Sequence, residues 1–146
     1  MEGHFLQPTA VERTLNKAVG FLAKLGLGPA YVWLLEVKGR KSGRIYTTPV
    51  NLHELGGRVY LVGGRGHTGW SKNAQAAGLV SLRRGGRRRN YRTRSLPDNE
   101  KPPILKSYLE RYPGTVQRFF SVPAGSPVES FRVIADHHPV LELIPI

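Results

Sequence analysis

The sequence lacks cysteine and has few acidic residues, and both features exclude classes of site. Without cysteine there is no disulfide, no thiolate nucleophile and no thiolate metal ligand. Ten carboxylates face 22 lysines and arginines, so the formal net charge is +12. A protein this basic usually binds something acidic: nucleic acid, an anionic membrane surface or a polyanionic small molecule. The carboxylates are scattered and suggest no paired acid/base site, so we expect an enzyme of this composition to rely on a cofactor.

Long apolar segments are also missing. The longest uncharged apolar stretch, residues 25–35, is interrupted by glycine and proline and is too short to cross a bilayer. Residues 1–20 do not combine the basic start and the apolar run of a secretory signal. These patterns predict a cytoplasmic protein. His137 and His138 are adjacent rather than at metal-ligand spacing, so no metal site is expected.

The order of elements predicts one α+β domain over residues 1–146. Residues 1–27 contain an amphipathic helix from about Val11 to Leu25, whose apolar face is expected to pack on the sheet. Residues 28–97 form the barrel core, and residues 98–146 add helices and a closing strand. About six mostly antiparallel strands are expected, and closing them into a barrel removes their exposed edges.

The strand and helix signals are local. Strands are expected at residues 31–37, 45–55, 58–62, 79–84, 87–95 and 140–144. Pro49 lies inside the second of these and requires an edge position or a bulge. Helices are expected at residues 70–77, at residues 102–112, and after Ser126, where Ser-Pro-Val-Glu matches a capping box.

Two glycine-rich loops are candidates for an anion site. Residues 39–44 (Gly-Arg-Lys-Ser-Gly-Arg) lie between two expected strands, so outward-facing amides and cationic side chains can hold phosphate or carboxylate. The alternative is an exposed basic turn, and the spacing is not that of a P-loop. Residues 62–73 place four glycines before an expected helix start, where free amides favour anions. Trp70 offers a flat surface for a ring system, or else belongs to the core.

Seven arginines occur between Arg83 and Arg94, within twelve residues. On an extended strand Arg87 and Arg89 share a face with Tyr91, a basic and aromatic combination typical of nucleic-acid binding. The alternative is an edge hairpin whose charges prevent aggregation. Tyr108 and Tyr112, four residues apart on one helix face, are either core residues or part of a substrate pocket.

The order of these motifs resembles the deazaflavin-dependent nitroreductase family. The matching pieces are residues 39–43, Thr48-Pro49, Val62-Gly63, and Trp70 with Asn73. The likeness covers residues 28–97, with a weaker match at His138-Pro139 and the last strand. It implies a split β-barrel and a reductase that uses the reduced 8-hydroxy-5-deazaflavin coenzyme, coenzyme F(420), in preference to FMN. That coenzyme carries a phosphate and an oligoglutamate tail, so it is a polyanion suited to a basic protein.

The resemblance also implies which residues bind the cofactor. Arg40, Lys41, Ser42 and Gly43 match the loop that holds the phosphate region. Tyr46 stands where the family usually has an arginine, and Arg44 is a candidate substitute. The remaining matches are Thr48 and Pro49 beside the ring, Gly63, Gly64 and Gly66 in a second cradle, and Trp70, Lys72 and Asn73 in the helix that closes it. The short loop between Gly63 and Trp70 indicates a divergent subgroup.

The function expected from this resemblance is hydride transfer to a small-molecule acceptor such as a quinone, an enone or a nitro compound. No catalytic residue is assigned, and Tyr108 and Tyr112 are candidates for the acceptor pocket. Two alternatives stay open: a non-enzymatic module that binds flavin, haem or lipid on the same barrel, and a nucleic-acid-binding protein that uses the arginine hairpin. The basic first helix is a candidate for association with an anionic membrane. The sequence leaves the oligomeric state open.

Overall fold

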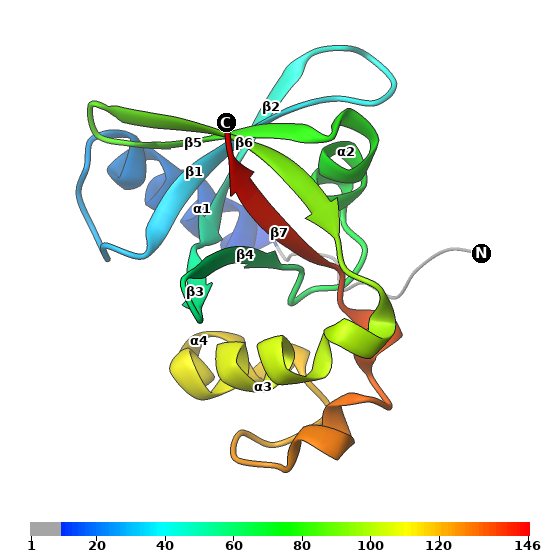
Figure 1. Cartoon of the computed structure of the whole chain (residues 1–146). Helices are drawn as coiled ribbons and strands as arrows, with labels where there is room; N and C mark the ends of the chain where they lie inside the picture. The colour runs from blue at the N-terminus through cyan, green and yellow to red at the C-terminus, as the bar shows by residue number, and fades with distance from the viewer. Residues whose placement is uncertain (1–9) are drawn as a thin grey trace.

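One antiparallel sheet of seven strands forms the centre of the molecule (Figure 1). The computed structural model describes residues 10–146, so the part of the predicted N-terminal segment before Ala10 lies outside the described residues. The strands are β1 (Val32–Lys38), β2 (Ile45–Asn51), β3 (His53–Leu55), β4 (Arg58–Val62), β5 (Leu79–Arg84), β6 (Arg87–Ser95) and β7 (Val140–Pro145). The α-helices are α1 (Ala10–Lys24), α2 (Gly69–Ala77), α3 (Pro102–Arg111) and α4 (Pro113–Val116). Four 3₁₀ turns complete the chain: η1 (Asp98–Glu100), η2 (Gln117–Phe119), η3 (Val128–Phe131) and η4 (Ala135–His137).

The sheet curls because its two end strands are neighbours in the chain. The strand order is β2-β1-β5-β6-β7-β4-β3, and Leu52 alone separates β2 from β3. The backbone N–H of Leu52 donates to the Tyr31 carbonyl at 2.7 Å, and its carbonyl accepts the Tyr112 hydroxyl. The chain therefore turns a corner at Leu52, which divides the predicted strand 45–55 into two. The α+β split barrel is confirmed, and Pro49 lies on the end strand β2, as predicted.

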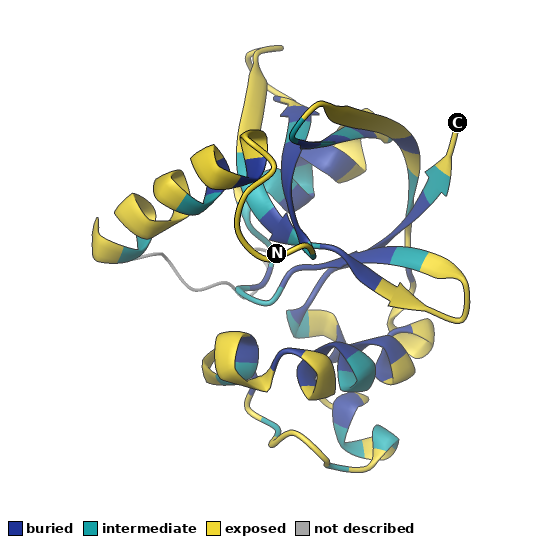
Figure 2. Ribbon diagram, turned by 90° about the vertical axis from the view of Figure 1, so that its left-hand side faces the viewer, coloured by how far each residue is buried: buried dark blue, intermediate teal, exposed yellow. Residues whose placement is uncertain are grey.

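Two hydrophobic cores lie one above the other (Figure 2). The first fills the barrel with side chains such as Trp33, Leu35 and Leu82. The second lies between the barrel end and the C-terminal helices, and it includes Leu105, Leu109 and Phe131. The helices α3 and α4 are therefore held against one open end of the barrel.

The first helix packs against the sheet through a different face from the one predicted. Gly20 and Ala23 are buried, while the larger apolar residues Val11, Leu15 and Leu25 are 69%, 57% and 54% exposed. A Cβ at Gly20 would lie 3.4 Å from Leu34, so the lack of a side chain lets the helix approach β1 closely. The expectation that the apolar stripe packs on the barrel is wrong. No helix within residues 10–146 is long and apolar enough to cross a membrane.

The capping box predicted at residues 126–129 does not form. Pro127 is the N-cap residue of η3, and no side chain caps this turn. The carbonyl of Ser126 accepts a hydrogen bond from Lys106 Nζ at 2.7 Å, which draws this residue toward α3. Phe131 is fully buried in the second core, so packing stops the turn after four residues.

Most of the arginine run has intramolecular partners. Arg87 and Arg89 both lie 5.3 Å from the ring centroid of Trp33, and Arg88 pairs with Glu36 at 3.1 Å. Arg94 pairs with Glu142 and Glu100 at 3.0 Å each. Arg84 is buried and donates to backbone carbonyls near the end of α1. These contacts explain the run without nucleic acid, and nucleic-acid binding stays an untested prediction.

Candidate functional site

A cavity of about 690 Å³, here called the central cavity, lies between the barrel and the helices that cover its end. Its lining comes from β2, parts of β1, the end of β4, the loop 63–68, the first half of α2, and parts of α1, α3, α4 and η2. Its volume falls in the range of sites for cofactor-sized ligands. Among residues 10–146 the lining contains Arg65 and Arg118 and no aspartate or glutamate, which suits an anionic ligand.

Six of the predicted site residues line the central cavity: Thr48, Pro49, Gly64, Trp70, Asn73 and Tyr108. Arg40 is joined to them through Asn73. The backbone N–H of Arg40 and its Nη1 both donate to Asn73 Oδ1, at 3.1 and 2.7 Å. Because Asn73 lies on α2, one amide oxygen connects the basic loop to the helix predicted to close the site.

The loop 39–44 offers cationic side chains rather than a cluster of free amides. The N–H of Gly39 donates to the Arg44 carbonyl at 2.7 Å, and the N–H of Gly43 donates to the Gly39 carbonyl. The Ser42 hydroxyl accepts the N–H of Arg44 and lies 3.1 Å from the Tyr46 hydroxyl. The prediction of outward-facing amides is therefore wrong for Gly39, Gly43 and Arg44, because the loop closes its own hydrogen bonds.

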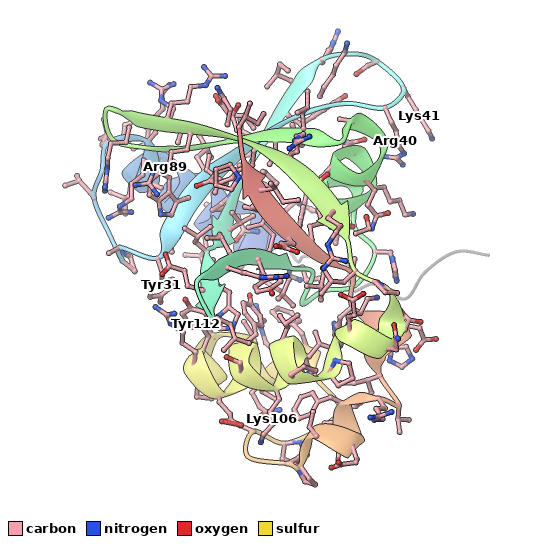
Figure 3. All side chains as sticks on the ribbon, viewed as in Figure 1. Tyr31, Arg40, Lys41, Arg89, Lys106 and Tyr112 are labelled. Carbon is pink, nitrogen blue, oxygen red and sulfur yellow. The ribbon has the colours of Figure 1, made fainter. Side chains whose placement is uncertain are left out.

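Tyr46 holds this loop in place. A Cβ at Gly39 would lie 2.5 Å from the Tyr46 ring, so only glycine fits beneath it. Residues 41–44 are exposed and lie outside the lining of the central cavity. Figure 3 shows Arg40 and Lys41 together at one end of the molecule, away from Tyr31 and Tyr112.

The N-terminus of α2 opens onto the central cavity, and the Thr68 hydroxyl there can both donate and accept a hydrogen bond. Thr68 is the N-cap residue, yet its side chain makes no capping hydrogen bond. Its hydroxyl oxygen is buried and has no partner among residues 10–146. Thr68, Gly69 and Trp70 all line the cavity, and the first amides of a helix attract anions. This unpaired hydroxyl beside free amides fits the phosphate of a nucleotide-like cofactor.

The glycines of the second loop shape it and do not all face the ligand space. A Cβ at Gly63 would lie 2.5 Å from Pro139 Cγ, and the Gly63 carbonyl lies 3.1 Å from His138 Nδ1. Gly66 is buried, and Lys72 is half-buried; neither lines the cavity. The loop can pack beneath the 138–139 segment because Gly63 has no side chain.

The two predicted tyrosines have different positions. Tyr108 lines the central cavity, and its hydroxyl accepts a hydrogen bond from Asn51 Nδ2 at 3.4 Å. Burial raises the pKa of the Tyr108 phenol well above its usual value. Tyr112 lies behind Tyr31, with ring centroids 4.7 Å apart, and its hydroxyl donates to the Leu52 carbonyl at 3.0 Å. Tyr112 is therefore outside the cavity lining, and Tyr31 takes its place in the wall.

His53 is buried beside both tyrosines, and we expect it to make the free energy of unfolding depend on pH. Its Nε2 lies 3.0 Å from the Ser107 hydroxyl, while Nδ1 has no partner within residues 10–146. Burial, with a smaller contribution from Arg111, lowers the pKa of His53 from 6.5 to about 4. Folding therefore favours the neutral ring, and its stabilisation is complete above pH 6.5.

The unfolding free energy is expected to fall as the pH drops from 6.5 toward 4, by at most about 1.4 kcal/mol per pH unit from this group. Urea unfolding at pH 7 and pH 5 measures the change. In His53→Gln this part of the pH dependence should disappear. Equal slopes for the wild type and the variant would show that His53 does not titrate in this way.

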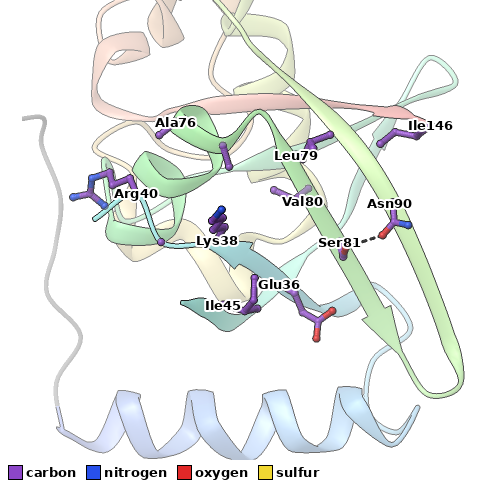
Figure 4. A pocket seen from close by; sticks show the side chains of 12 residues that line it. Glu36, Lys38, Arg40, Ile45, Ala76, Leu79, Val80, Ser81, Asn90 and Ile146 are labelled. Carbon is purple, nitrogen blue, oxygen red and sulfur yellow. Dashed lines mark hydrogen bonds between the residues drawn. The ribbon is translucent and has the colours of Figure 1, made fainter. Parts of the chain in front are cut away.

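A second cavity of about 750 Å³ lies elsewhere on the barrel (Figure 4). It shares Arg40 with the predicted site, but its wall contains Glu36 and exposed apolar residues such as Ile45 and Leu79. Lys38 and Arg40 lie in the same wall, and Glu36 is paired with Arg88 at 3.1 Å. The central cavity is distinguished from this one by the N-terminus of α2 and the Thr68 hydroxyl, and it contains more of the predicted site residues.

Among the lining residues that the sequence prediction did not include, several have polar or aromatic groups suited to a ligand: Tyr31, Asn51, Arg65, Thr68, Arg118 and Phe119. Thr68 has the residue type and position of an N-cap, so the sequence contained a signal for it. Arg118 and Phe119 reach the cavity from η2, at the far end of the chain, and no local pattern indicates this.

Solved structures with similar folds share the curled sheet. An F(420)H(2)-dependent reductase is 23% identical with a TM-score of 0.52, and the match covers 77% of this chain and 93% of that one. A NimC/NimA family protein from Clostridium acetobutylicum is 15% identical with a TM-score of 0.52, covering 88% and 79%. An FAD-binding protein from Mesorhizobium loti is 14% identical with a TM-score of 0.50, covering 94% and 90%. At these identities the likeness concerns the fold alone.

The curled antiparallel sheet is a split barrel, the fold that these solved structures share. The sequence model of the F(420)H(2)-dependent quinone reductase family matches residues 8–123, and the chain belongs to that family. A comparison with curated proteins found no match. The protein is therefore an oxidoreductase that uses reduced coenzyme F(420), and the prediction of a deazaflavin-dependent enzyme is confirmed, rather than the non-enzymatic carrier.

Proposed function

We propose that this reductase transfers the hydride to a quinone, an enone or a nitro compound bound in the central cavity. One observation carries the proposal: a single cavity joins the N-terminus of α2, with its unpaired Thr68 hydroxyl, to the buried phenol of Tyr108. The first group suits the anionic part of the coenzyme. The second suits the oxygen of an acceptor that gains a proton as it is reduced.

The coenzyme would be held by two groups of residues. Thr68 and the first amides of α2 would bind its phosphate, and Arg40, held by Asn73, would meet its acidic tail together with Lys41. Thr48, Pro49 and Trp70 would lie beside the ring system, since all three line the cavity. When bound, the reduced deazaflavin supplies the hydride.

The acceptor would lie at the Tyr108 end of the cavity. Asn51 donates to the oxygen of Tyr108, so the phenolic proton is directed to another acceptor. The phenol is protonated at neutral pH, and because burial raises its pKa it gives up the proton only to a strongly basic oxygen, such as the oxyanion formed when the acceptor is reduced. We therefore assign Tyr108 the role of proton donor to the reduced oxygen, with Tyr31 and Asn51 as neighbouring polar groups in the wall.

Titration of the protein with oxidised coenzyme F(420) and, separately, with FMN tests the cofactor part of the proposal. Fluorescence of the coenzyme is expected to report saturable binding, with FMN binding more weakly. Lys41→Ala should weaken coenzyme binding about tenfold, because one charged contact in an exposed loop is lost. Lys24→Ala, an exposed lysine on α1, is the matched control. Unchanged affinity in Lys41→Ala would remove this loop from the site.

A second proposal concerns the outer face of α1. Val11, Leu15 and Leu22 form an exposed apolar stripe along this helix, and Arg13, Lys17 and Lys24 are exposed on another side of it. We propose that the stripe binds an anionic lipid surface, because an apolar stripe with cationic side chains elsewhere on the same helix offers contacts to both lipid tails and headgroups. Binding through this helix places the protein close to a membrane in which a lipophilic acceptor dissolves.

Sedimentation with vesicles that contain anionic phospholipid tests this second proposal. The double variant Leu15→Gln/Leu22→Gln is expected to lose most vesicle binding and to keep coenzyme affinity. Val133→Gln removes a comparably exposed side chain, 78% exposed, at another place and is the control. Equal binding of all three proteins, or none by the wild type, would contradict the proposal.

A further inference from the structure

Two arginines at the edge of the central cavity already bind a carboxylate. Glu12 Oε2 accepts hydrogen bonds from the Nη2 atoms of Arg65 and Arg118, the latter at 2.7 Å. Both guanidinium groups lie over the ring of Phe119, 4.5 Å from its centroid. The Glu12 and Arg65 side chains are only 16% and 20% exposed, and Arg118 closes the cluster from the surface, where it is 60% exposed. This cluster is therefore a preorganised carboxylate site built from three separate parts of the chain.

The two arginines face the cavity, whereas the carboxylate does not. Arg65, Arg118 and Phe119 line the central cavity, and Glu12 is not in its wall. Two guanidinium groups against one carboxylate leave an excess of positive charge at this point. An anion inside the cavity can therefore reach the same guanidinium groups and compete with Glu12 for their hydrogen bonds.

Glu12 also determines how the first half of α1 is held. Residues 10–18 are exposed apart from Glu12, which is half-buried, whereas Gly20 and Ala23 in the second half are buried against the sheet. The end of the helix is fixed further by Arg84, which donates to the carbonyl of Gly28 at 2.9 Å. The Arg65 and Arg118 pairs thus join the loosely packed half of α1 to the cavity wall.

We propose that Glu12 competes for the Arg65–Arg118 pair with one carboxylate of the coenzyme's glutamyl tail, a different carboxylate from those that meet Arg40 and Lys41. This inference rests on the proposed function, in which the central cavity takes the coenzyme. The recognising chemistry is the same for both ligands: a carboxylate oxygen shared by two guanidinium donors. Binding of the coenzyme then releases Glu12, so the affinity for the anionic tail is set partly by a residue outside the cavity.

The variant Glu12→Gln tests the competition because it keeps the shape of the side chain and removes its charge. The dissociation constant of oxidised coenzyme F(420) should fall about tenfold, as expected for removal of one charge-assisted competitor. The deazaflavin nucleoside, which lacks the phosphate and the tail, should bind the variant and the wild type equally. Arg118→Gln should weaken binding of the coenzyme and leave binding of the nucleoside unchanged.

Glu110→Gln is the matched control, since it makes the same change in net charge at a surface pair with Lys106 on α3. The unfolding free energy of each variant is measured alongside, so that loosening of α1 is separated from ligand affinity. If the wild type binds the coenzyme and Glu12→Gln binds it with equal or lower affinity, this inference alone is overturned. A wild-type protein that does not bind the coenzyme overturns the proposed function and this inference with it.

Discussion

Replacing Tyr108 with phenylalanine is expected to lower kcat about a hundredfold, which is within the range of a single general acid. The variant keeps the ring that fills the cavity wall and loses only the hydroxyl that Asn51 orients. The dissociation constant of the coenzyme should stay unchanged, because its proposed contacts lie at the α2 end of the cavity. Steady-state kinetics with a quinone and fluorescence titration of the coenzyme measure the two effects separately.

Tyr112→Phe is the comparison that isolates the role of Tyr108. Its hydroxyl donates to the Leu52 carbonyl and does not reach the cavity, so the loss should reduce stability by about 1 kcal/mol and leave kcat unaltered. A Tyr108→Phe enzyme as active as the wild type would remove the proposed proton donor. Equal losses of activity in both variants would indicate that disturbance of the shared aromatic cluster is responsible.

Replacing Arg84 with methionine is expected to lower the unfolding free energy by about 3 kcal/mol. Arg84 is buried, and its guanidinium donates to the carbonyls of Val32 and Gly28 at 2.8 and 2.9 Å. Longer contacts of 3.4 and 3.5 Å reach the carbonyls of Leu27 and Gly26. The carbonyls of Gly26, Leu27 and Gly28 belong to the connection between α1 and β1, and that of Val32 belongs to the first residue of β1. Without the guanidinium they lose this buried donor.

Urea unfolding of Arg84→Met, Arg84→Lys and Arg92→Met measures this contribution. Arg84→Lys should recover only part of the stability, because an ammonium group cannot reproduce the planar fork of donors. Arg92 is exposed on β6, and its replacement should change stability by less than about 0.5 kcal/mol. A stability of Arg84→Met equal to that of the wild type would show that water satisfies these carbonyls equally well.

The hairpins could be predicted from sequence because their signals are local. Gly56 and Gly57 both have positive φ, 59° and 76°, which is the conformation that a two-residue turn requires and that glycine adopts without strain. Gly78, with φ of 71°, ends α2 for the same reason. The register of each hairpin then follows from its turn, so most of the sheet could be predicted before any long-range contact was known.

The first helix shows where local patterns stop being sufficient. The spacing of Val11, Leu15 and Leu22 correctly predicts an apolar stripe, but a stripe does not say what covers it. The helix instead packs on the sheet through Gly20 and Ala23, because a helix face with small side chains can approach β1 and β2 more closely. The choice depends on the shape of the partner surface, which the helix sequence does not contain.

The features of the site also fall into two groups: those that local patterns predict and those that depend on contacts between distant residues. The two glycine-rich loops and the helix start near Gly69 could be predicted from the amino-acid order, because turn geometry and helix capping depend on short segments, and the excess of positive charge follows from composition. The contacts of Arg40 with Asn73 and of Glu12 with Arg65 and Arg118, and the entry of Tyr108 rather than Tyr112 into the cavity, depend on the tertiary fold. These contacts join residues far apart in the chain, and their geometry depends on how the barrel closes at Leu52 and on which side chains the two cores bury.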